Sequence, residues 1–305
     1  MNIKIRGELI ENAPIGKQSW FRCGGNADLL FKPADANDLS SFLKQWPVLE
    51  PLTIVGGLAN TIIRDGGIRG ATIQLGKSFS EVQVLDGQYI QAGCGALNGN
   101  IAAAAVKAGI GGAEFLSGIP GSLGGALRMN AGAYGAEMKD ILIGVNAVNR
   151  AGEPVRLTAE ELKMSYRKTE LPEDLILISA VLKGASEDYE TVKKRIAKIK
   201  KKRNETQPIK EQTGGSTFAN PSPQALSRAG LSEDMRAWQV VEKVGCRGFS
   251  IGGAQMSEKH CNFMINTGDA TAADLENLGD EIRKRALNDL GLDLHWEIKR
   301  IGERD

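Results

Sequence analysis

The feature that most constrains this chain is a glycine-rich segment, residues 109–135, which reads GIGGAEFLSGIPGSLGGALRMNAGAYG. Nine of its 27 residues are glycine. Glycine reaches positive φ at little cost and lets another molecule touch the backbone, but it loses more entropy on folding than other residues. A flexible linker would be rich in serine and glycine, whereas this segment carries Phe115, Leu116, Leu123 and Leu127, which indicate packing. The segment therefore predicts a buried wall that holds a large ligand.

The composition and charge are those of an ordinary globular protein. Of 305 residues, 42% are hydrophobic and 25% are charged, and the formal net charge is +1. This balance gives no electrostatic basis for binding nucleic acid or an anionic membrane. No apolar run reaches the roughly 18 residues that a bilayer span needs. The first residues, MNIKIRGELIENAPIG, lack the apolar core of a signal peptide. We therefore expect a cytoplasmic protein with no nucleic-acid or membrane partner.

Cysteine and histidine usage argues against a metal site. The four cysteines are scattered without C-x-x-C spacing, and the two histidines are His260 and His295. Zinc sites need clustered cysteine and histidine ligands, so no metal is predicted. Scattered cysteines are typical of reduced thiols in a cytosolic protein. The neighbours of His260 are apolar, which favours a packed or supporting histidine over a catalytic one.

Hydrophobic periodicity predicts a chain of mixed helices and strands. Helices are expected over residues 35–46, 98–107, 187–207, 237–244 and 271–290. Strands are expected over residues 52–55, 73–75, 82–85, 89–92, 144–149, 175–182 and 292–298. Asp86-Gly87 predicts a hairpin turn. The helix over 187–207 carries a lysine-rich face, for which a solvated surface is favoured over an anion-binding one. We expect a domain boundary where this helix ends.

A second glycine turn follows the predicted strand 52–55. The strand runs directly into Gly56-Gly57, and small residues follow. Backbone N–H groups in such a turn can form a nest for a diphosphate, and a tight surface turn is the alternative. The segment is not the dinucleotide fingerprint G-x-G-x-x-G, and no βαβ pattern surrounds it.

Three further segments carry side chains that could do chemistry. Arg167 lies between two predicted strands, where a guanidinium could meet an oxyanion, although an exposed arginine is the default. The turn TGGSTFANP presents Ser216 from an unusual backbone turn. It is not the G-x-S-x-G elbow of hydrolases, and a plain turn is equally consistent. Glu297 lies on the polar face of the predicted terminal strand and points either to solvent or into a cleft.

Taken together, these segments resemble one family. The same segments occur in the same order in the UDP-N-acetylenolpyruvoylglucosamine reductases, the MurB family of bacterial peptidoglycan synthesis. They are Gly56–Asn60, EFLSGIPGSLGGALRMNAGAYG, SYR at residues 165–167, GGSTFANP, GGAQMSEKHCNFMINTG and the final WEIKRIG. The GIPGSLGGA and GSTFANP segments are specific, whereas the glycine pairs are not. The resemblance extends from Arg22 to Gly302, and the lysine-rich helix and C-terminal histidine segment look like the shorter type II form.

The resemblance implies a fold and a cofactor. The implied fold is α+β, with a vanillyl-alcohol-oxidase/PCMH-type FAD-binding fold in two subdomains, residues 1–78 and 79–205. A C-terminal α/β substrate-binding domain follows at residues 206–305, and its last few residues can pack back on the FAD domain. The implied cofactor is non-covalent FAD, because no histidine occurs in the first 259 residues to attach it. The implied co-substrate is NADPH, and the implied state is a monomer in the bacterial cytoplasm.

The resemblance also implies a reaction and its catalytic residues. NADPH reduces FAD, and hydride then passes to the methylene carbon of UDP-N-acetylglucosamine enolpyruvate. A proton added at the α-carbon gives UDP-N-acetylmuramate. Ser216 matches the family's proton donor, and Arg167 and Glu297 match the pair that stabilises the enolate-like intermediate. A fixed cation suits that charge. An ionised carboxylate would oppose it, so Glu297 is expected to be protonated or held in a proton network.

The remaining implied roles fall on the glycine-rich segments and on a few polar side chains. The implied FAD contacts are Val55, Gly56, Gly57, Leu58, Ala59, Asn60, Gly118, Ile119, Pro120, Gly121, Ser122, Gly124, Gly125, Asn130, Ala131 and Gly132. The implied substrate contacts are Tyr166, Asn220 and Lys259. Ala219 stands where the family often has lysine, so a diphosphate contact is either missing or supplied elsewhere, for example by Lys259 or the basic helix. The family usually has G-S-N where this chain has Leu58-Ala59-Asn60, which removes a hydroxyl but keeps the backbone nest.

Two other functions stay open on the sequence alone. Another oxidase or dehydrogenase on the same flavin fold would keep both glycine-rich segments without needing Arg167, Ser216 and Glu297 together. A non-catalytic module that binds a nucleotide or nucleotide sugar would be colourless when purified. The visible spectrum separates this module from the two flavoenzymes.

Overall fold

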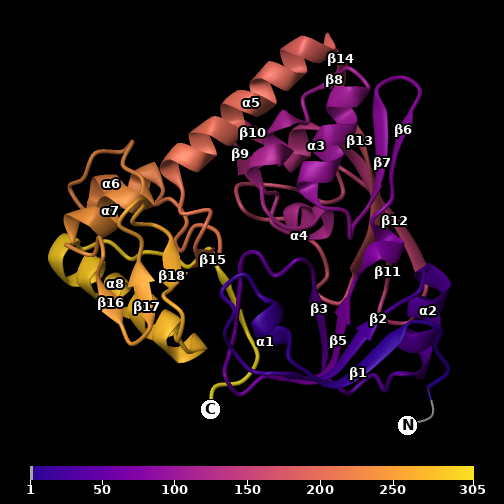
Figure 1. The fold of residues 1–305 in the computed structure, drawn as a ribbon, viewed down its shortest axis with the longest axis horizontal. Helices are drawn as coiled ribbons and strands as arrows, with labels where there is room; N and C mark the ends of the chain where they lie inside the picture. Colours follow the sequence, from indigo (N-terminus) through magenta and orange to yellow (C-terminus); the bar gives the residue numbers. More distant parts are fainter. Residues whose placement is uncertain (1–2) are drawn as a thin grey trace. The chain divides into compact units, whose positions relative to one another are not determined.

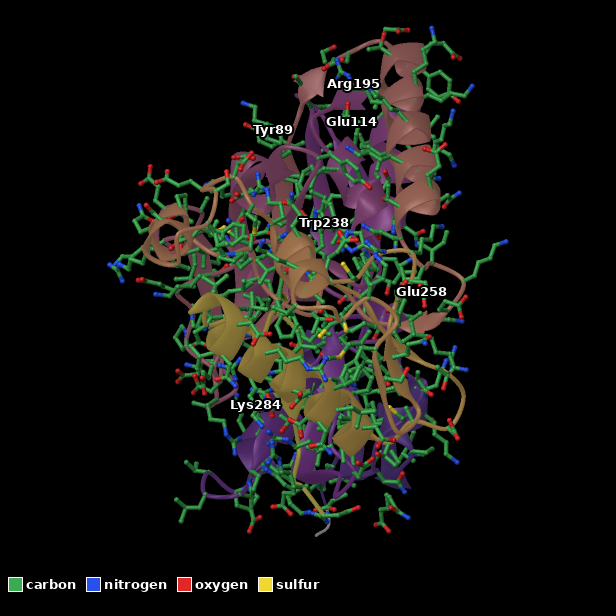
Figure 2. The ribbon with its side chains drawn as sticks, turned by 90° about the vertical axis from the view of Figure 1, so that its left-hand side faces the viewer. Tyr89, Glu114, Arg195, Trp238, Glu258 and Lys284 are labelled. Atoms are coloured by element: carbon green, nitrogen blue, oxygen red, sulfur yellow. The ribbon has the colours of Figure 1, made fainter. Side chains whose placement is uncertain are left out.

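The chain folds into two compact units, each built from segments that are distant in the sequence. The structure is a computed structural model and describes residues 3–305. Figure 1 traces the chain and Figure 2 adds the side chains. Unit 1 contains the described residues up to Asn12, Asp28–Gly57 and Arg69–Arg203. Unit 2 contains Ala13–Ala27, Leu58–Ile68 and Asn204–Asp305. The three-part division at residues 78 and 205 stays a prediction.

The first sheet of unit 1 has the strand order β1-β2-β5-β3. Its strands are β1 (Glu8–Ala13), β2 (Ala27–Lys32), β3 (Leu52–Val55) and β5 (Ile68–Gln74), and the helix beside it is α2 (Ala36–Gln45). Phe31 of β2 and Phe42 of α2 stack with ring centroids 4.3 Å apart. Asp35 caps α2, because its carboxylate accepts the backbone N–H of Asp38. The predicted helix 35–46 and strand 52–55 are confirmed.

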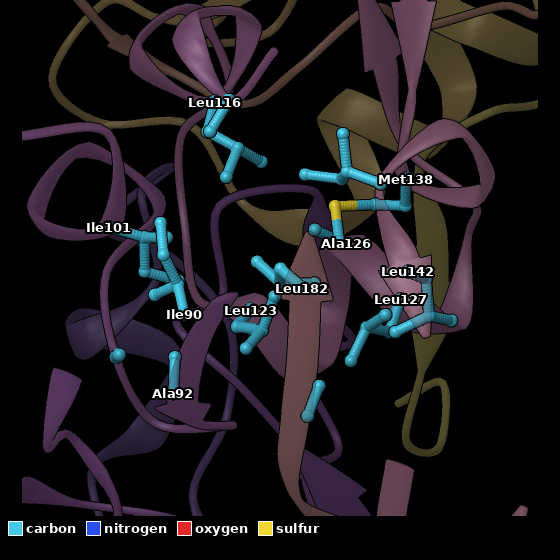
Figure 3. Packing of buried hydrophobic residues seen from close by; sticks show 14 of the residues in the cluster. Ile90, Ala92, Ile101, Leu116, Leu123, Ala126, Leu127, Met138, Leu142 and Leu182 are labelled. Atoms are coloured by element: carbon cyan, nitrogen blue, oxygen red, sulfur yellow. The ribbon is translucent and has the colours of Figure 1, made fainter. Parts of the chain in front are cut away.

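The second sheet of unit 1 is antiparallel, with the order β12-β11-β13-β7-β6. Its strands are β6 (Val82–Leu85), β7 (Tyr89–Gly93), β11 (Leu142–Val148), β12 (Pro154–Thr158) and β13 (Ile176–Lys183). Side chains of this sheet pack with those of α3 (Asn98–Lys107) and α4 (Leu123–Arg128) in a buried core (Figure 3). Strands β6 and β7 pair across a turn in which Gly87 has φ +73°, so the predicted hairpin is confirmed. The predicted helix over residues 98–107 is confirmed as α3.

Short elements and one long helix complete unit 1. They are η1 (Lys77–Phe79), β8 (Ile110–Gly111), η2 (Glu114–Gly118), β9 (Gly132–Ala133), β10 (Ala136–Glu137), η3 (Met138–Asp140), β14 (Ala185–Ser186) and α5 (Tyr189–Thr206). The lysines of α5 are exposed, which confirms the solvated face. Arg195 of α5 is anchored by Glu114 at 2.9 Å and by Glu187 at 2.8 Å; Figure 2 labels Arg195 and Glu114.

Unit 2 combines a four-stranded sheet, a parallel strand pair and helices. The sheet has the order β15-β18-β17-β16, and the pair is β4 with β19. The elements are α1 (Ile15–Gln18), β4 (Thr61–Ile63), β15 (Gln212–Thr213), α6 (Pro223–Arg228), α7 (Ala237–Lys243), β16 (Ser250–Ile251), β17 (Ala254–Met256), β18 (Met264–Asn266), α8 (Ala272–Leu290) and β19 (Lys299–Ile301). Thr271 caps α8, and Gly291 ends it in the left-handed conformation, as predicted. Within residues 3–305, no helix is both long and apolar enough to cross a membrane.

The prediction of a strand over residues 292–298 is wrong. The predicted alternation of buried and exposed side chains is present, because Leu292, Leu294 and Ile298 are buried while Asp293 and His295 are exposed. In place of a strand ladder, the segment makes an isolated bridge between Trp296 and Phe218 and bonds to the turn that carries Ser216. The regular strand begins only at Lys299.

Candidate active site

In unit 1, Arg167 occupies a tight two-residue turn. Ser165 and Lys168 exchange backbone hydrogen bonds of 2.9 and 3.1 Å on either side of it. Arg167 has φ +54°, a left-handed conformation that costs an L-residue about 1–2 kcal/mol. Its Nη2 donates to the carbonyl oxygen of Gly132 at 3.0 Å. The arginine is therefore fixed against the glycine-rich segment of its own unit.

The two glycine turns of unit 1 meet backbone to backbone. A Cβ atom on Gly57 would lie 3.3 Å from the Cα of Gly121, and one on Gly56 would lie 2.7 Å from the Oγ of Ser122. Gly121 has φ +90°, as the Pro-Gly pair predicts. The Oγ of Ser122 is buried and has no hydrogen-bond partner among the described residues. A Cβ at Gly56 would therefore displace the Ser122 hydroxyl, which lies unused beside the two turns.

The other predicted FAD contacts of unit 1 lie in elements that adjoin these turns. Val55 ends β3, Gly118 ends η2, Ile119 and Pro120 precede Gly121, Gly124 and Gly125 lie in α4, and Ala131 and Gly132 lead into β9. The Gly124 N–H donates to Cys94 O at 2.9 Å, which fixes the start of α4 on the end of β7. Asn130 is fully buried, and its side chain bonds to Glu137, Ser165 and Lys139.

The three residues after Gly57 belong to unit 2. Leu58 is buried and has φ +51°, so a branched side chain occupies a conformation that favours glycine. The Asn60 Nδ2 donates to the carbonyl of Glu297 at 3.1 Å, and the Asn60 carbonyl accepts the Lys299 N–H at 3.0 Å. The sequence assigned Asn60 to the diphosphate turn. The structure gives its side chain a second task, which is to hold the backbone of Glu297.

In unit 2, distant segments are hydrogen-bonded around Ser216. The Thr217 N–H donates to the Asn262 carbonyl at 2.7 Å, and the Thr217 carbonyl accepts the Glu297 N–H at 2.8 Å. The Asn262 side chain also pairs with the N–H and carbonyl of Phe218, at 3.0 and 2.9 Å. Ser216 and Glu297 are both half-buried. The structure therefore brings the backbones of these two predicted catalytic residues side by side.

Comparison with known proteins identifies the family. Residues 207–301 match the model of the UDP-N-acetylenolpyruvoylglucosamine reductase C-terminal domain, and residues 27–158 match an FAD binding domain. The UDP-N-acetylenolpyruvoylglucosamine reductase of Paramagnetospirillum magneticum is 50% identical over 301 residues, which cover 99% of this chain and 94% of that protein. That of Parvibaculum lavamentivorans is 47% identical over 301 residues, covering 99% and 93%. The chain belongs to the MurB family.

A solved MurB structure agrees with this assignment. The crystal structure of MurB from Thermus caldophilus has a TM-score of 0.80 and 28% identity, and the match covers 98% of this chain and 100% of that one. The predicted α+β architecture, a PCMH-type FAD-binding fold with a C-terminal MurB domain, is therefore confirmed. As a family member with an FAD-binding domain, the protein is an oxidoreductase and a flavoprotein.

The predicted substrate contacts of this MurB chain lie in different places. Tyr166 is exposed beside Arg167, whose guanidinium lies 5.2 Å from its ring centroid. The Asn220 Oδ1 accepts the N–H of Ala237, the first residue of α7, at 3.1 Å. The Lys259 Nζ donates to the Asn204 carbonyl at 2.5 Å. Lys259 also lines a groove of about 700 Å³ in unit 2.

A larger groove of about 940 Å³ lies in unit 1 beside α5. Tyr134 and Gly135, at the end of the glycine-rich segment, form part of its wall. Neither this groove nor the one beside Lys259 is lined by Arg167, Ser216 or Glu297.

His260 is a packed side chain, as the sequence predicts. Its ring lies edge-on to Phe263 at 4.8 Å and to Trp238 at 6.4 Å, and burial lowers its pKa. Its Nδ1 accepts the Asn262 N–H at 3.3 Å. His260 therefore supports the asparagine that holds the Ser216 turn. The sequence reasoning missed Asn262 as part of this arrangement.

Proposed function

We propose that this MurB chain is an NADPH-dependent reductase that converts UDP-N-acetylglucosamine enolpyruvate to UDP-N-acetylmuramate in bacterial peptidoglycan synthesis. We further propose that it works as a cytoplasmic monomer. The observation that supports the proposal most strongly is the backbone pairing of the turn at residues 213–221, which carries Ser216, with residues 292–298, which carry Glu297. Within a chain of this family, the Thr217–Glu297 backbone bond sets Ser216 beside Glu297. A plain surface turn would not need this pairing.

The residues of unit 1 fit FAD. The backbones of Gly57 and Gly121 approach so closely that a Cβ on Gly57 would lie 3.3 Å from the Gly121 Cα, and the positive φ of Gly121 favours glycine. Backbone N–H groups in such turns bind diphosphate, and the unpartnered Ser122 hydroxyl supplies a further hydrogen bond. Bound FAD supplies the redox chemistry, by taking hydride from NADPH and delivering it to the methylene carbon of the substrate. The chain holds FAD without a covalent bond.

The three catalytic residues serve the second half of the reaction, in which the substrate is reduced. Arg167 stabilises the negative charge that develops on the enolpyruvyl group, and its bond to Gly132 fixes the direction of the guanidinium. The Ser216 hydroxyl delivers the proton that the α-carbon receives. Glu297 stabilises the enolate either as the protonated acid or as part of a proton network, because an ionised carboxylate would oppose the charge there. One hydride and one proton are thereby added across the carbon–carbon double bond.

Substrate recognition belongs to residues 206–305 and the segment beside Arg167. We propose that Tyr166 and Asn220 contact the substrate and that Lys259 contacts its diphosphate. Lys259 lines the unit 2 groove together with a second lysine, Lys210. A lysine is a compact point charge that suits a phosphate. Lys259 would thereby replace the lysine that the family often has at Ala219.

Two measurements on the purified protein test this function. The protein should show the visible spectrum of bound flavin, and NADPH oxidation should require UDP-N-acetylglucosamine enolpyruvate. A protein that stays colourless after incubation with FAD would contradict a flavoenzyme. NADPH oxidation that is indifferent to the enolpyruvyl substrate would favour another oxidase or dehydrogenase on the same fold. Mass spectrometry of the product checks the addition of two hydrogens.

A further inference from the structure

We propose that Asn130 is a positioning residue for Arg167 and that its side chain acts on substrate reduction, with no direct contact to FAD. This inference rests on the role proposed for Arg167. Asn130 lies in the glycine-rich segment, and sequence reasoning places it among the FAD contacts. Its hydrogen bonds point elsewhere, because both N–H donors and the carbonyl oxygen of its fully buried amide are engaged by protein groups.

One bond of the amide fixes the backbone that leads into Arg167. The Asn130 Nδ2 donates to the Ser165 carbonyl at 2.9 Å. Ser165 is also the residue that exchanges backbone hydrogen bonds with Lys168 across the Arg167 turn. Because Arg167 has φ +54°, its turn is intrinsically unfavourable for an arginine and needs such outside support.

The other bonds of the amide fix the group that Arg167 holds. The Asn130 Nδ2 donates to the Oε2 of Glu137 at 2.7 Å. Glu137 in β10 pairs with Gly132 in β9, and the carbonyl of Gly132 accepts the Arg167 guanidinium. The Asn130 Oδ1 accepts the Lys139 N–H at 3.0 Å, which secures the residues just after β10.

The contacts therefore form a closed loop. A single amide holds the start of the Arg167 turn and, through Glu137, the carbonyl that orients its guanidinium. Asn130 itself has φ +41°, a conformation that asparagine tolerates better than most residues. With both N–H groups engaged, the amide has no donor left for a ligand. Its function is to set the position of Arg167.

The test uses the Asn130→Asp variant of the full-length, FAD-loaded protein. Aspartate keeps the size and the backbone preference, but it places a carboxylate against Glu137 and the Ser165 carbonyl. We expect substrate reduction in rapid mixing to slow by about 10- to 100-fold, because a small misplacement of a catalytic group costs rate on this scale. We expect flavin reduction by NADPH to stay within about twofold, with the loss in kcat larger than any change in KM.

Asn149→Asp is the matched control. The Asn149 Nδ2 donates to Glu153 Oε2 at 3.0 Å, so this change brings two carboxylates together in the same unit without touching the Arg167 turn. Both half-reactions of this control should stay within about twofold, because surface substitutions are nearly neutral. If the aspartate variant at Asn130 does not fold, Asn130→Gly removes all three hydrogen bonds of the amide, suits the same φ and is judged by the same rates.

The outcomes separate this inference from the proposed function. Equal slowing of both half-reactions, no slowing, or weaker FAD binding with a normal rate of substrate reduction once the variant is loaded with FAD would overturn the positioning role. A crystal structure of the variant decides the matter even if the wild-type protein lacks the proposed activity. We expect the Ser165–Lys168 turn to shift and the Arg167–Gly132 bond to be lost, and an unchanged turn would overturn the inference.

Discussion

Two regions of the molecule prepare the proposed reaction in different ways. Around Gly56 and Gly121, backbone approaches backbone, and the surface is shaped by the absence of side chains. Around Ser216 and Glu297, backbone hydrogen bonds join separate segments so that each presents a side chain. The first region suits binding and the second suits chemistry. Changes in the first should therefore alter FAD affinity, and changes in the second should alter the rate of substrate reduction.

The largest effect is expected from Ser216→Ala in the second region. Removing the proton donor should slow substrate reduction by about 10²- to 10⁴-fold, the usual contribution of a general acid. Flavin reduction by NADPH and FAD affinity should stay near normal. Stopped-flow measurement of each half-reaction provides the check, with the exposed Ser227→Ala on α6 as the control. A comparable loss of rate in both half-reactions would contradict a specific role of the Ser216 region in substrate reduction.

A smaller effect, on affinity, is expected from Gly56→Ala in the first region. The new Cβ would lie 2.7 Å from the Ser122 Oγ and displace the hydroxyl that we propose as an FAD contact. Overpacking costs about 1–3 kcal/mol, so FAD should bind roughly 5- to 150-fold more weakly. Titration of the apoprotein with FAD measures this. Gly76→Ala is the control, because a Cβ there meets nothing within 4 Å and no positive φ is required. Equal affinities for the two variants would argue against the glycine turns as the FAD surface.

The smallest effect is expected from Thr271→Ala, which lies in neither region. The Thr271 side chain caps α8 by accepting the Asp274 N–H at 3.0 Å. Its loss should lower the free energy of unfolding by about 1 kcal/mol. FAD affinity and both half-reactions should be unchanged when the folded variant is assayed. Urea unfolding measures the first quantity. An altered rate would mean that general destabilisation, rather than position, governs the other variants.

The sequence could predict what short segments determine by themselves. Thr271 as a cap, Gly291 as a helix end and the turn at Gly121 all follow from residues a few positions apart. The terminal segment shows the limit of this reasoning. Alternation identified the buried face of residues 292–298 correctly, but it could not show that the neighbour is a turn rather than a strand.

The supporting asparagines could not be found in this way. Asn60 bonds to Glu297 across 237 positions, and Asn262 bonds to Phe218 across 44. No local pattern marks such pairs, because the hydrogen bonds exist only after the segments have come together. Asn130 illustrates the same limit, since its place in a glycine-rich segment suggested a ligand contact while its amide bonds to protein. Family resemblance supplied the proposed catalytic residues, and the structure supplied what holds their backbones.

The most direct test of this account combines substitutions at Arg167 and Ser216. The account assigns the two residues to one step, the reduction of the enolpyruvyl group. The measurement is the rate of substrate reduction in Arg167→Ala, Ser216→Ala and the double variant, each loaded with FAD and reduced by NADPH. The account predicts that the double variant loses much less than the product of the two single losses, because residues that act in one transition state are not additive. Losses that multiply, as expected for independent sites, would contradict it.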